Sequence, residues 1–150
     1  MSTPLVFTAR SPRVALPYLF AAQAQKEATV NEGLARIDAL LTPAVEEIAS
    51  SPPASPSEGQ CWIISANPQG DWAGRENDMA VFTAGTWLFV NPQVGMAVFD
   101  KAAGVTRRWD GGWNAPAIPA SPSGGSTIDA EARAAIDGLI DTLRDAGVGV

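Results

Sequence analysis

Five short runs of β-forming residues, each bounded by turn residues, constrain the fold of this chain more than any other feature. The runs are Cys61–Ser65, Met79–Thr83, Thr86–Val90, Gly95–Asp100 and Val105–Asp110. Short glycine turns separate several of them, at Ala84-Gly85, Ala102–Gly104 and Asp110–Gly112. Because tight turns of this kind join antiparallel strands, the sequence predicts a small antiparallel β-meander or sandwich over residues 59–115.

Residues 21–50, before the strands, have helical character. The stretch Ala21–Ala28 is rich in strong helix formers, and Thr29–Glu32 fits a capping box that would start a second helix near Val30. Apolar residues then recur at three- and four-residue intervals, at Leu34, Ile37, Leu40, Leu41, Ala44, Val45 and Ile48. Pro43 either kinks this second helix or opens a further turn.

A Pro/Ser/Gly-rich linker, residues 116–126, leads to a predicted amphipathic C-terminal helix over residues 127–147, with Ser126 as the expected N-cap. The apolar residues of this helix have the alternating spacing of a coiled-coil seam: Ala132, Ile136, Leu139, Leu143 and Ala146. Since the seam lasts only about two heptads, the helix either packs on its own domain or associates with other chains. The whole pattern predicts an α+β fold with N-terminal helices, an antiparallel sheet domain and a C-terminal helix.

Composition excludes several classes of function. A chain of 150 residues is sized for one domain, and its net charge of −6 makes nucleic acid a poor partner. With no His and a single Cys, the chain cannot carry Ser-His or Cys-His catalysis, a histidine metal site or an intrachain disulfide. We expect no cofactor and no resident metal. The absence of a signal peptide and of 18 consecutive apolar residues predicts a soluble protein made in the cytoplasm, with no membrane partner.

Two sets of residues could contact ligands. Asp71, Glu76 and Asp78 surround a glycine-containing loop, where carboxylates can bind Ca²⁺ or act as a glycosidase pair, but we favour simple solvation. The five tryptophans suggest sugar stacking, although aromatic residues on strands more often build a core or a subunit interface. Trp72 and Trp113 are the better ligand candidates because they lie next to predicted turns.

Apolar stripes and an extended arm are the predicted protein interfaces. The predicted oligomer or docking interface consists of Leu34, Ile37, Leu41 and Val45, together with Ile136, Leu139 and Leu143 of the C-terminal helix. Residues 1–20 form an arm without helical periodicity. Its apolar run, Leu5, Val6 and Phe7, is expected to grip another protein by adding to a sheet edge. The alternative is an arm that folds back over its own β-domain.

Several motifs taken together resemble one known family. They are LPY at Leu16–Tyr18, QAQKE at Gln23–Glu27, NEGLARIDAL at Asn31–Leu40, PPASPSEGQCWII at Pro52–Ile64 and WAG at Trp72–Gly74. This pattern, which spans roughly residues 10–115, resembles DUF2793. That family of uncharacterised function is carried by phages, prophages and phage-like particles of alphaproteobacteria, often in tail-fibre or spike proteins.

The resemblance implies a non-enzymatic virion structural protein. It would be a spike or fibre base, or an adaptor, on the capsid or tail of a phage or gene transfer agent, and would support host attachment. The apolar stripes predict a homotrimer, or a pentamer at a capsid vertex, in contact with capsid, tail or fibre proteins. The alternative is a carbohydrate-binding module that contacts host capsule or lipopolysaccharide through exposed Trp rings. A polysaccharide-cleaving enzyme is a third class that no paired-carboxylate motif supports.

Overall fold

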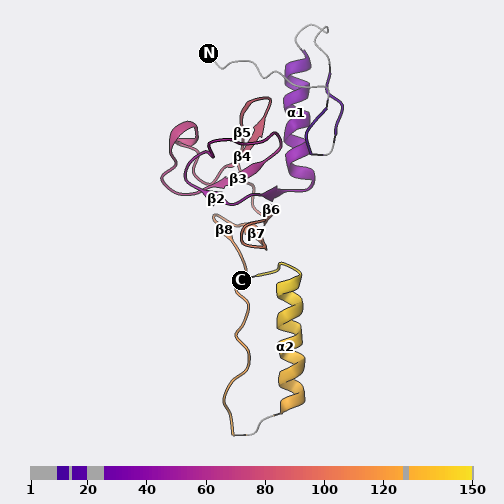
Figure 1. Cartoon of the computed structure of the whole chain (residues 1–150), viewed down its shortest axis with the longest axis vertical. Coiled ribbons are helices and arrows are strands. Elements are labelled where there is room, and N and C mark those ends of the chain that lie inside the picture. Colours follow the sequence, from indigo (N-terminus) through magenta and orange to yellow (C-terminus); the bar gives the residue numbers. More distant parts are fainter. Residues whose placement is uncertain (1–9, 14, 20–25, 127–128, 150) are drawn as a thin grey trace.

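The chain forms an elongated molecule with its β-structure and one helix at one end and a second helix at the other (Figure 1). The computed structural model describes residues 10–13, 15–19, 26–126 and 129–149. The predicted α+β fold class is confirmed, with a C-terminal helix as expected. The arm residues Leu5, Val6 and Phe7 lie outside the described residues.

In the described part of the N-terminal region there is one helix, α1 (Lys26–Leu41), which begins before the expected start of the second predicted helix. Most of the first predicted helix, residues 21–25, lies outside the described residues. The predicted capping box is wrong, because Thr29 lies within α1 and not at its N-terminus. The prediction that residues 44–48 continue the helix is also wrong. Pro43 lacks a backbone N–H and disfavours helical geometry at Thr42, so the chain leaves the helix there and continues as strands.

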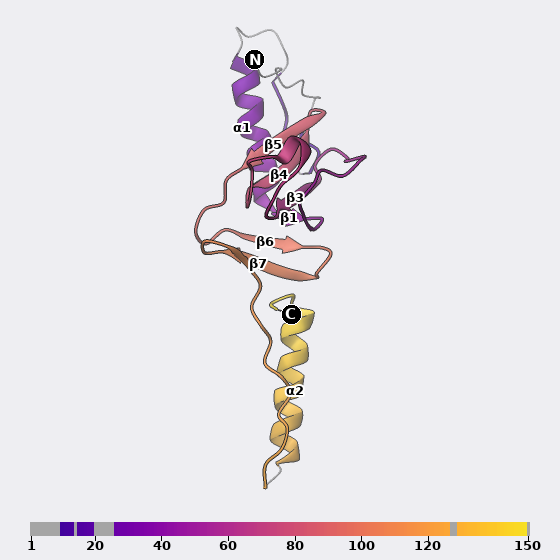
Figure 2. The same cartoon turned by 90° about the vertical axis from the view of Figure 1, so that its left-hand side faces the viewer.

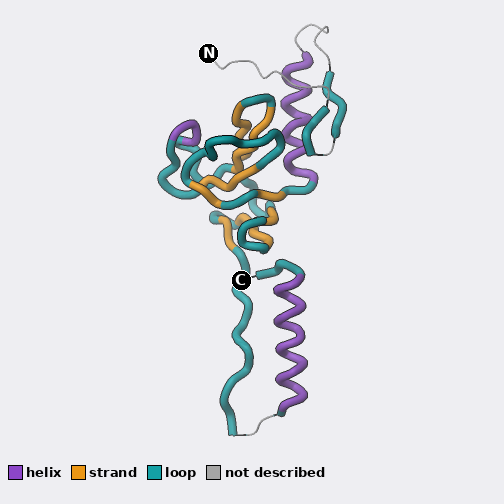
Figure 3. The backbone as a smooth tube through the Cα atoms, viewed as in Figure 1, coloured by secondary structure: helices purple, strands orange, loops and turns teal. Residues whose placement is uncertain are grey.

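The strands form two four-stranded sheets (Figure 3). One sheet has the order β1 (Ala44–Val45), β6 (Ala97–Asp100), β7 (Val105–Trp109) and β8 (Trp113–Asn114). The other has the order β2 (Ile48–Ala49), β3 (Cys61–Ile64), β4 (Met79–Thr83) and β5 (Thr86–Val90). A 3₁₀ turn, η1 (Gly70–Trp72), lies in the long connection between β3 and β4.

The antiparallel pairs agree with the predicted meander. The β4–β5, β6–β7 and β7–β8 hairpins turn where the glycines predict. In the β4–β5 turn both Ala84 (φ 53°) and Gly85 (φ 71°) have positive φ, the geometry that matches the twist of a two-residue hairpin. The parallel pairs were not predicted: β1 pairs with β6 and β2 with β3, so residues 44–49 bridge the two sheets. Parallel pairing joins segments that are distant in sequence, and no local turn signals it.

Two apolar clusters lie on opposite faces of the β2–β5 sheet. On one face, α1 covers residues of alternate strand positions: Cys61, Ile63, Met79, Val81, Leu88 and Val90. On the other face the aromatic cluster contains Trp62 and Trp72, with Phe82, Trp87 and Phe89 partly buried against it. Period-two alternation therefore places the two sets of strand residues on different faces.

The C-terminal helix α2 (Ala130–Asp145) lies beside the extended linker that precedes it (Figures 1 and 3). Its N-cap is Asp129, whose side chain accepts a hydrogen bond from the Ala132 N–H, and not Ser126 as predicted. The linker leaves β8 and runs away from the sheets, and α2 returns toward them, so the two form a projecting hairpin.

Candidate functional site

The outer face of α2 carries one of the exposed apolar patches of the described chain. Ile136, Leu139 and Leu143 are 42%, 64% and 40% exposed. Among the side chains of α2, all of which the structure describes, only Ile140 is buried. The three predicted interface residues of this helix therefore lie at the surface and are each about half exposed.

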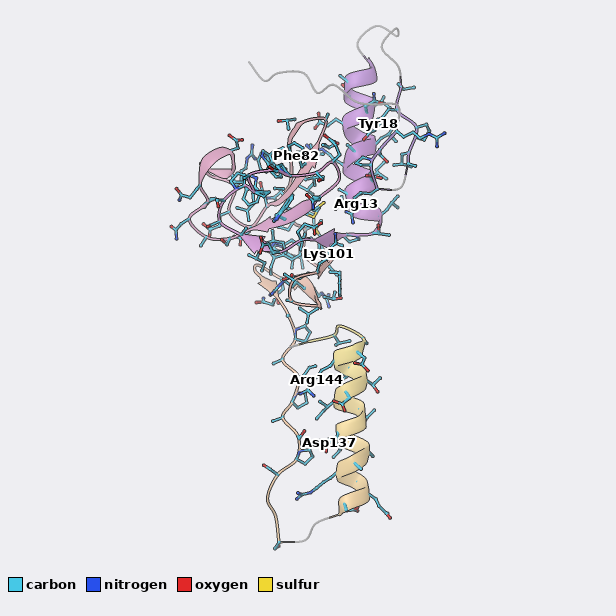
Figure 4. The ribbon with its side chains drawn as sticks, in the orientation of Figure 1. Arg13, Tyr18, Phe82, Lys101, Asp137 and Arg144 are labelled. Carbon is cyan, nitrogen blue, oxygen red and sulfur yellow. The ribbon has the colours of Figure 1, made fainter. Side chains whose placement is uncertain are left out.

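The linker-facing side of α2, about a quarter turn from this face, carries charge. Arg133 donates a hydrogen bond to the carbonyl oxygen of Gly124 in the linker. Asp137 and Arg144 lie on this same side (Figure 4). One carboxylate oxygen of Asp137, Oδ1, is buried without a hydrogen-bond partner among the described residues. The helix thus turns several charged side chains and Ile140 toward the linker and leaves Ile136, Leu139 and Leu143 exposed, unlike an amphipathic helix that packs its whole apolar stripe on its own core.

The C-terminal end of α2 is anchored to the β1–β6–β7–β8 sheet. Gly147 has a positive φ of 64° and follows the helix as a left-handed cap, with the Val148 N–H donating to the Leu143 carbonyl. The Gly147 carbonyl accepts a hydrogen bond from the Thr106 N–H of β7 at 2.7 Å. A Cβ at Gly147 would lie 3.1 Å from the Gly104 oxygen and 3.2 Å from the Phe99 ring. The attachment therefore requires glycine at this position.

A second apolar patch lies on α1. Ile37 and Leu41 are 49% and 58% exposed, whereas Leu34 is partly buried against the core. Placing Val45 in this patch was wrong, because Val45 lies in β1 and is fully buried. Val30, which is exposed, belongs to the patch instead. The seven-residue spacing from Val30 to Ile37 already signalled this, but the mistaken helix start hid it.

The N-terminal segment that is described is pinned to α1 by polar contacts. The Ser11 hydroxyl donates to one carboxylate oxygen of Asp38 at 2.6 Å, and the backbone N–H of Arg13 donates to the other oxygen at 3.0 Å. Asn31 exchanges two hydrogen bonds with the backbone of Leu19. Asn31 and Asp38 both belong to the NEGLARIDAL motif, so in this structure two of its polar residues hold the preceding segment in place. Residues 10–13 and 15–19 therefore fold back on their own domain.

The Arg13 side chain closes the C-terminal end of α1 (Figure 4). Its guanidinium donates to the carbonyl oxygens of Ala39 and Thr42 and lies 3.6 Å from the Cys61 sulfur. Burial raises the pKa of the Cys61 thiol to about 11, although the nearby positive charge of Arg13 opposes the shift. Cys61 packs as a small apolar residue in the cluster beneath α1, and its cationic neighbour Arg13 comes from a distant part of the chain.

The tryptophans mostly build the interior. Trp72, one of the two predicted ligand contacts, is fully buried, which corrects that prediction. Its ring packs on Trp87 with centroids 5.1 Å apart, and its Nε1 has no hydrogen-bond partner in the described part of the chain. Trp113 is partly buried, donates its Nε1 hydrogen to the Asn77 carbonyl and stacks near Trp109 with centroids 5.4 Å apart. Trp87, Trp109 and Trp113 each retain some outward surface, and Trp109 and Trp113 lie together.

The candidate carboxylates do not form a common site. Asp78 is buried, accepts a hydrogen bond from Asn91 and lies 3.7 Å from Arg75, whereas Asp71 and Glu76 are exposed. Within the described residues no group of His, Cys, Asp or Glu side chains is arranged to hold a metal ion. A search of the same residues finds no helix with the length and apolar character needed to cross a membrane.

Comparison with known proteins identifies a family. Residues 30–114 match the family model described as "Protein of unknown function (DUF2793)", which covers more than half of the chain. The chain therefore belongs to this family. No curated protein and no solved structure matches it. The match ends at the last strand, so the linker and α2 lie outside it.

Proposed function

We propose that this DUF2793 protein is a non-enzymatic structural component of a phage or gene transfer agent particle, as a spike or fibre base or an adaptor. The observation that supports the proposal is the shape of the chain. A packed β-core carries a projecting hairpin of linker and α2 whose apolar side is uncovered (Figures 1 and 2). Such a projection suits a protein that is built into a larger assembly, because uncovered apolar surface is removed from water on assembly.

The proposal assigns different partners to the two apolar surfaces. The α1 patch of Val30, Ile37 and Leu41 lies beside the β-core and docks on another virion protein. The α2 face serves association between copies, with a trimer favoured and a pentamer at a capsid vertex as the other arrangement. In this role the protein supports attachment of the particle to its host.

Particle composition tests the proposal directly. Particles purified from the producing bacterium are expected to contain the protein in stoichiometric amounts by quantitative mass spectrometry. Deleting its gene should yield particles that lack it and attach poorly to host cells. Absence of the protein from purified particles would overturn the proposal.

The α1 patch can be tested in the same particles. The double variant Ile37→Asp/Leu41→Asp is expected to reduce incorporation at least about tenfold, because it would place two charges in an apolar interface. Both residues are about half exposed in the chain itself, so the fold should be kept. Ala28→Asp, at another exposed position of α1, is the matched control and should be incorporated normally.

A second candidate function is direct binding of host capsule or lipopolysaccharide. It is favoured by the partly exposed Trp109–Trp113 pair beside the polar Asp110 and Asn114, whose side chains are hydrogen-bonded at 2.7 Å. Titration of the protein with purified host polysaccharide tests it. Binding that is lost in Trp109→Ala would support this function, and no binding by the wild type would reject it.

A further inference from the structure

The linker-facing side of α2 carries charged residues beside one buried apolar residue, and most of the apolar stripe is left exposed. Arg133, Asp137 and Arg144 face the linker together with Ile140, while the apolar residues face solvent. At 100° per residue, the apolar face lies about a quarter turn from the linker-facing side. The linker therefore covers one flank of α2 and leaves the face of Ile136, Leu139 and Leu143 accessible.

We propose that this face packs against α2 of other copies of the same chain, in a parallel three-helix bundle with the linkers on the outside. The inference deepens the homo-oligomeric part of the proposed function. It assigns the interface to α2 and sets the number and direction of the helices.

The partner that packs on this face is another copy of the chain, because the face is self-complementary. Ala132, Ile136, Leu139, Leu143 and Ala146 occupy alternating heptad core positions, so identical helices fit one another in register. The flanking positions are Ala135 and Thr142 on one edge of the seam, and Arg133 and Ile140 on the edge that the linker borders. Only one of these four is charged, so copies that each carry a net charge of −6 meet along a surface without facing acidic residues.

The size of the face favours three copies over two. A helix of 16 residues is about 24 Å long and about 10 Å wide, so a simple pair covers one small strip of each helix. That strip is below the roughly 800 Å² per partner that stable interfaces bury, so a second helix contact on each α2 brings the buried area nearer to that value. In a three-helix bundle each α2 contacts two neighbours, which roughly doubles the area that it buries. A closed assembly of three identical chains has a threefold axis, and the helices around it run in the same direction.

The anchor at Gly147 is compatible with this arrangement. Because the C-terminal end of each α2 is joined to its own sheet through the Thr106 to Gly147 hydrogen bond, a parallel bundle gathers the β-cores at one end. The linker-facing charges of α2 then remain on the outside of the bundle.

Light scattering of the purified full-length chain at micromolar concentration tests the inference. The wild type is expected to have three times the 15.6 kDa mass of one chain. Leu139→Glu should weaken association at least about 100-fold, because it buries a charge in the bundle, and should leave the circular dichroism of the β-core unchanged. Ala134→Glu adds the same charge at an exposed position outside the seam and should remain trimeric. Equal masses for the two variants would overturn the inference, as would a monomeric wild type.

Disulfide trapping tests the direction of the helices. Ala132→Cys, near the N-terminal end of the seam, forms an interchain disulfide only if the helices are parallel, whereas Ala134→Cys on the outer side should not. The native thiol of Cys61 is buried and does not interfere. Trimers without the Ala132→Cys crosslink would refute the parallel bundle. These experiments test only the helix bundle. The proposed function is tested separately, by whether purified particles contain the protein.

Discussion

The two helices have the same length, 16 residues each, but are held in opposite ways. Helix α1 faces its core with Asn31, Ala35, Asp38 and Ala39, so small and polar side chains make its attachment. Helix α2 is held at its end by Gly147 and along one side by the linker, and buries only Ile140 among its side chains. In both helices several residues of the periodic apolar stripe are left exposed.

Apolar periodicity in a sequence therefore locates the apolar stripe of a helix but does not tell which surface that stripe packs against. On α1 the stripe partly meets the core through Leu34, while Ile37 and Leu41 stay outside. On α2 the whole stripe is outside. The expected difference is that α1 belongs to the cooperative core, whereas α2 can detach without unfolding that core.

The largest expected effect is at Asp38 of α1. Asp38→Ala removes the acceptor for both the Ser11 hydroxyl and the Arg13 N–H and should destabilise the core by about 3 kcal/mol in urea unfolding. Asp137→Ala is the matched change on α2. Because one oxygen of Asp137 is buried and unpaired and Ala has the higher helix propensity, no loss of stability is expected. Similar losses for the two variants would contradict the distinction between the helices.

Gly147→Val tests the attachment of α2. The substituted residue would need a positive φ and would crowd the Gly104 oxygen, so the anchor should weaken by about 2 kcal/mol. Hydrogen exchange of residues 130–145 is expected to accelerate while exchange of β3 and β4 stays the same. Gly138→Ala lies within α2, where a Cβ meets nothing within 4 Å, and should slow that exchange slightly.

The buried thiol beneath α1 should give a pH dependence that α2 does not share. In the native state the pKa of the Cys61 thiol is raised to about 11, whereas the ordinary pKa of a cysteine thiol is 9.0. The unfolded thiol therefore ionises first, and stability should fall as pH rises from about 9 to about 11, by roughly 1 kcal/mol between pH 8 and pH 10. Urea unfolding of the wild type and of Cys61→Ala at both pH values measures the difference. An unchanged difference between the two proteins would refute the prediction.

The smallest effect is expected at the helix N-termini. Asp129→Ala removes the cap of α2 and should cost that helix roughly 0.5 to 1 kcal/mol, seen as faster exchange of its first turn. Thr29→Ala, at the position where the sequence suggested a cap for α1, should be neutral or slightly stabilising because Thr29 is exposed within the helix. Destabilisation by Thr29→Ala comparable to that by Asp129→Ala would show that α1 begins at Thr29 in solution.

The sequence by itself determined the local features, which depend on residues close to one another in the chain. The hairpin turns at Ala84-Gly85 and Asp110–Gly112, the alternating strands between them and the apolar seam of α2 all follow from short-range backbone preferences and side-chain spacing. Membership of the family was also readable from short motifs.

Only the tertiary structure decided which surface each side chain meets. It buried Trp72 in the aromatic cluster, placed Val45 in a strand parallel to β6, brought Arg13 to the end of α1 and turned the charged side of α2 toward the linker. These outcomes depend on contacts between segments far apart in the chain. Their free energies come from the desolvation of side chains and from pairing between them at close range. These contributions cannot be read from the residue types at neighbouring positions in the sequence.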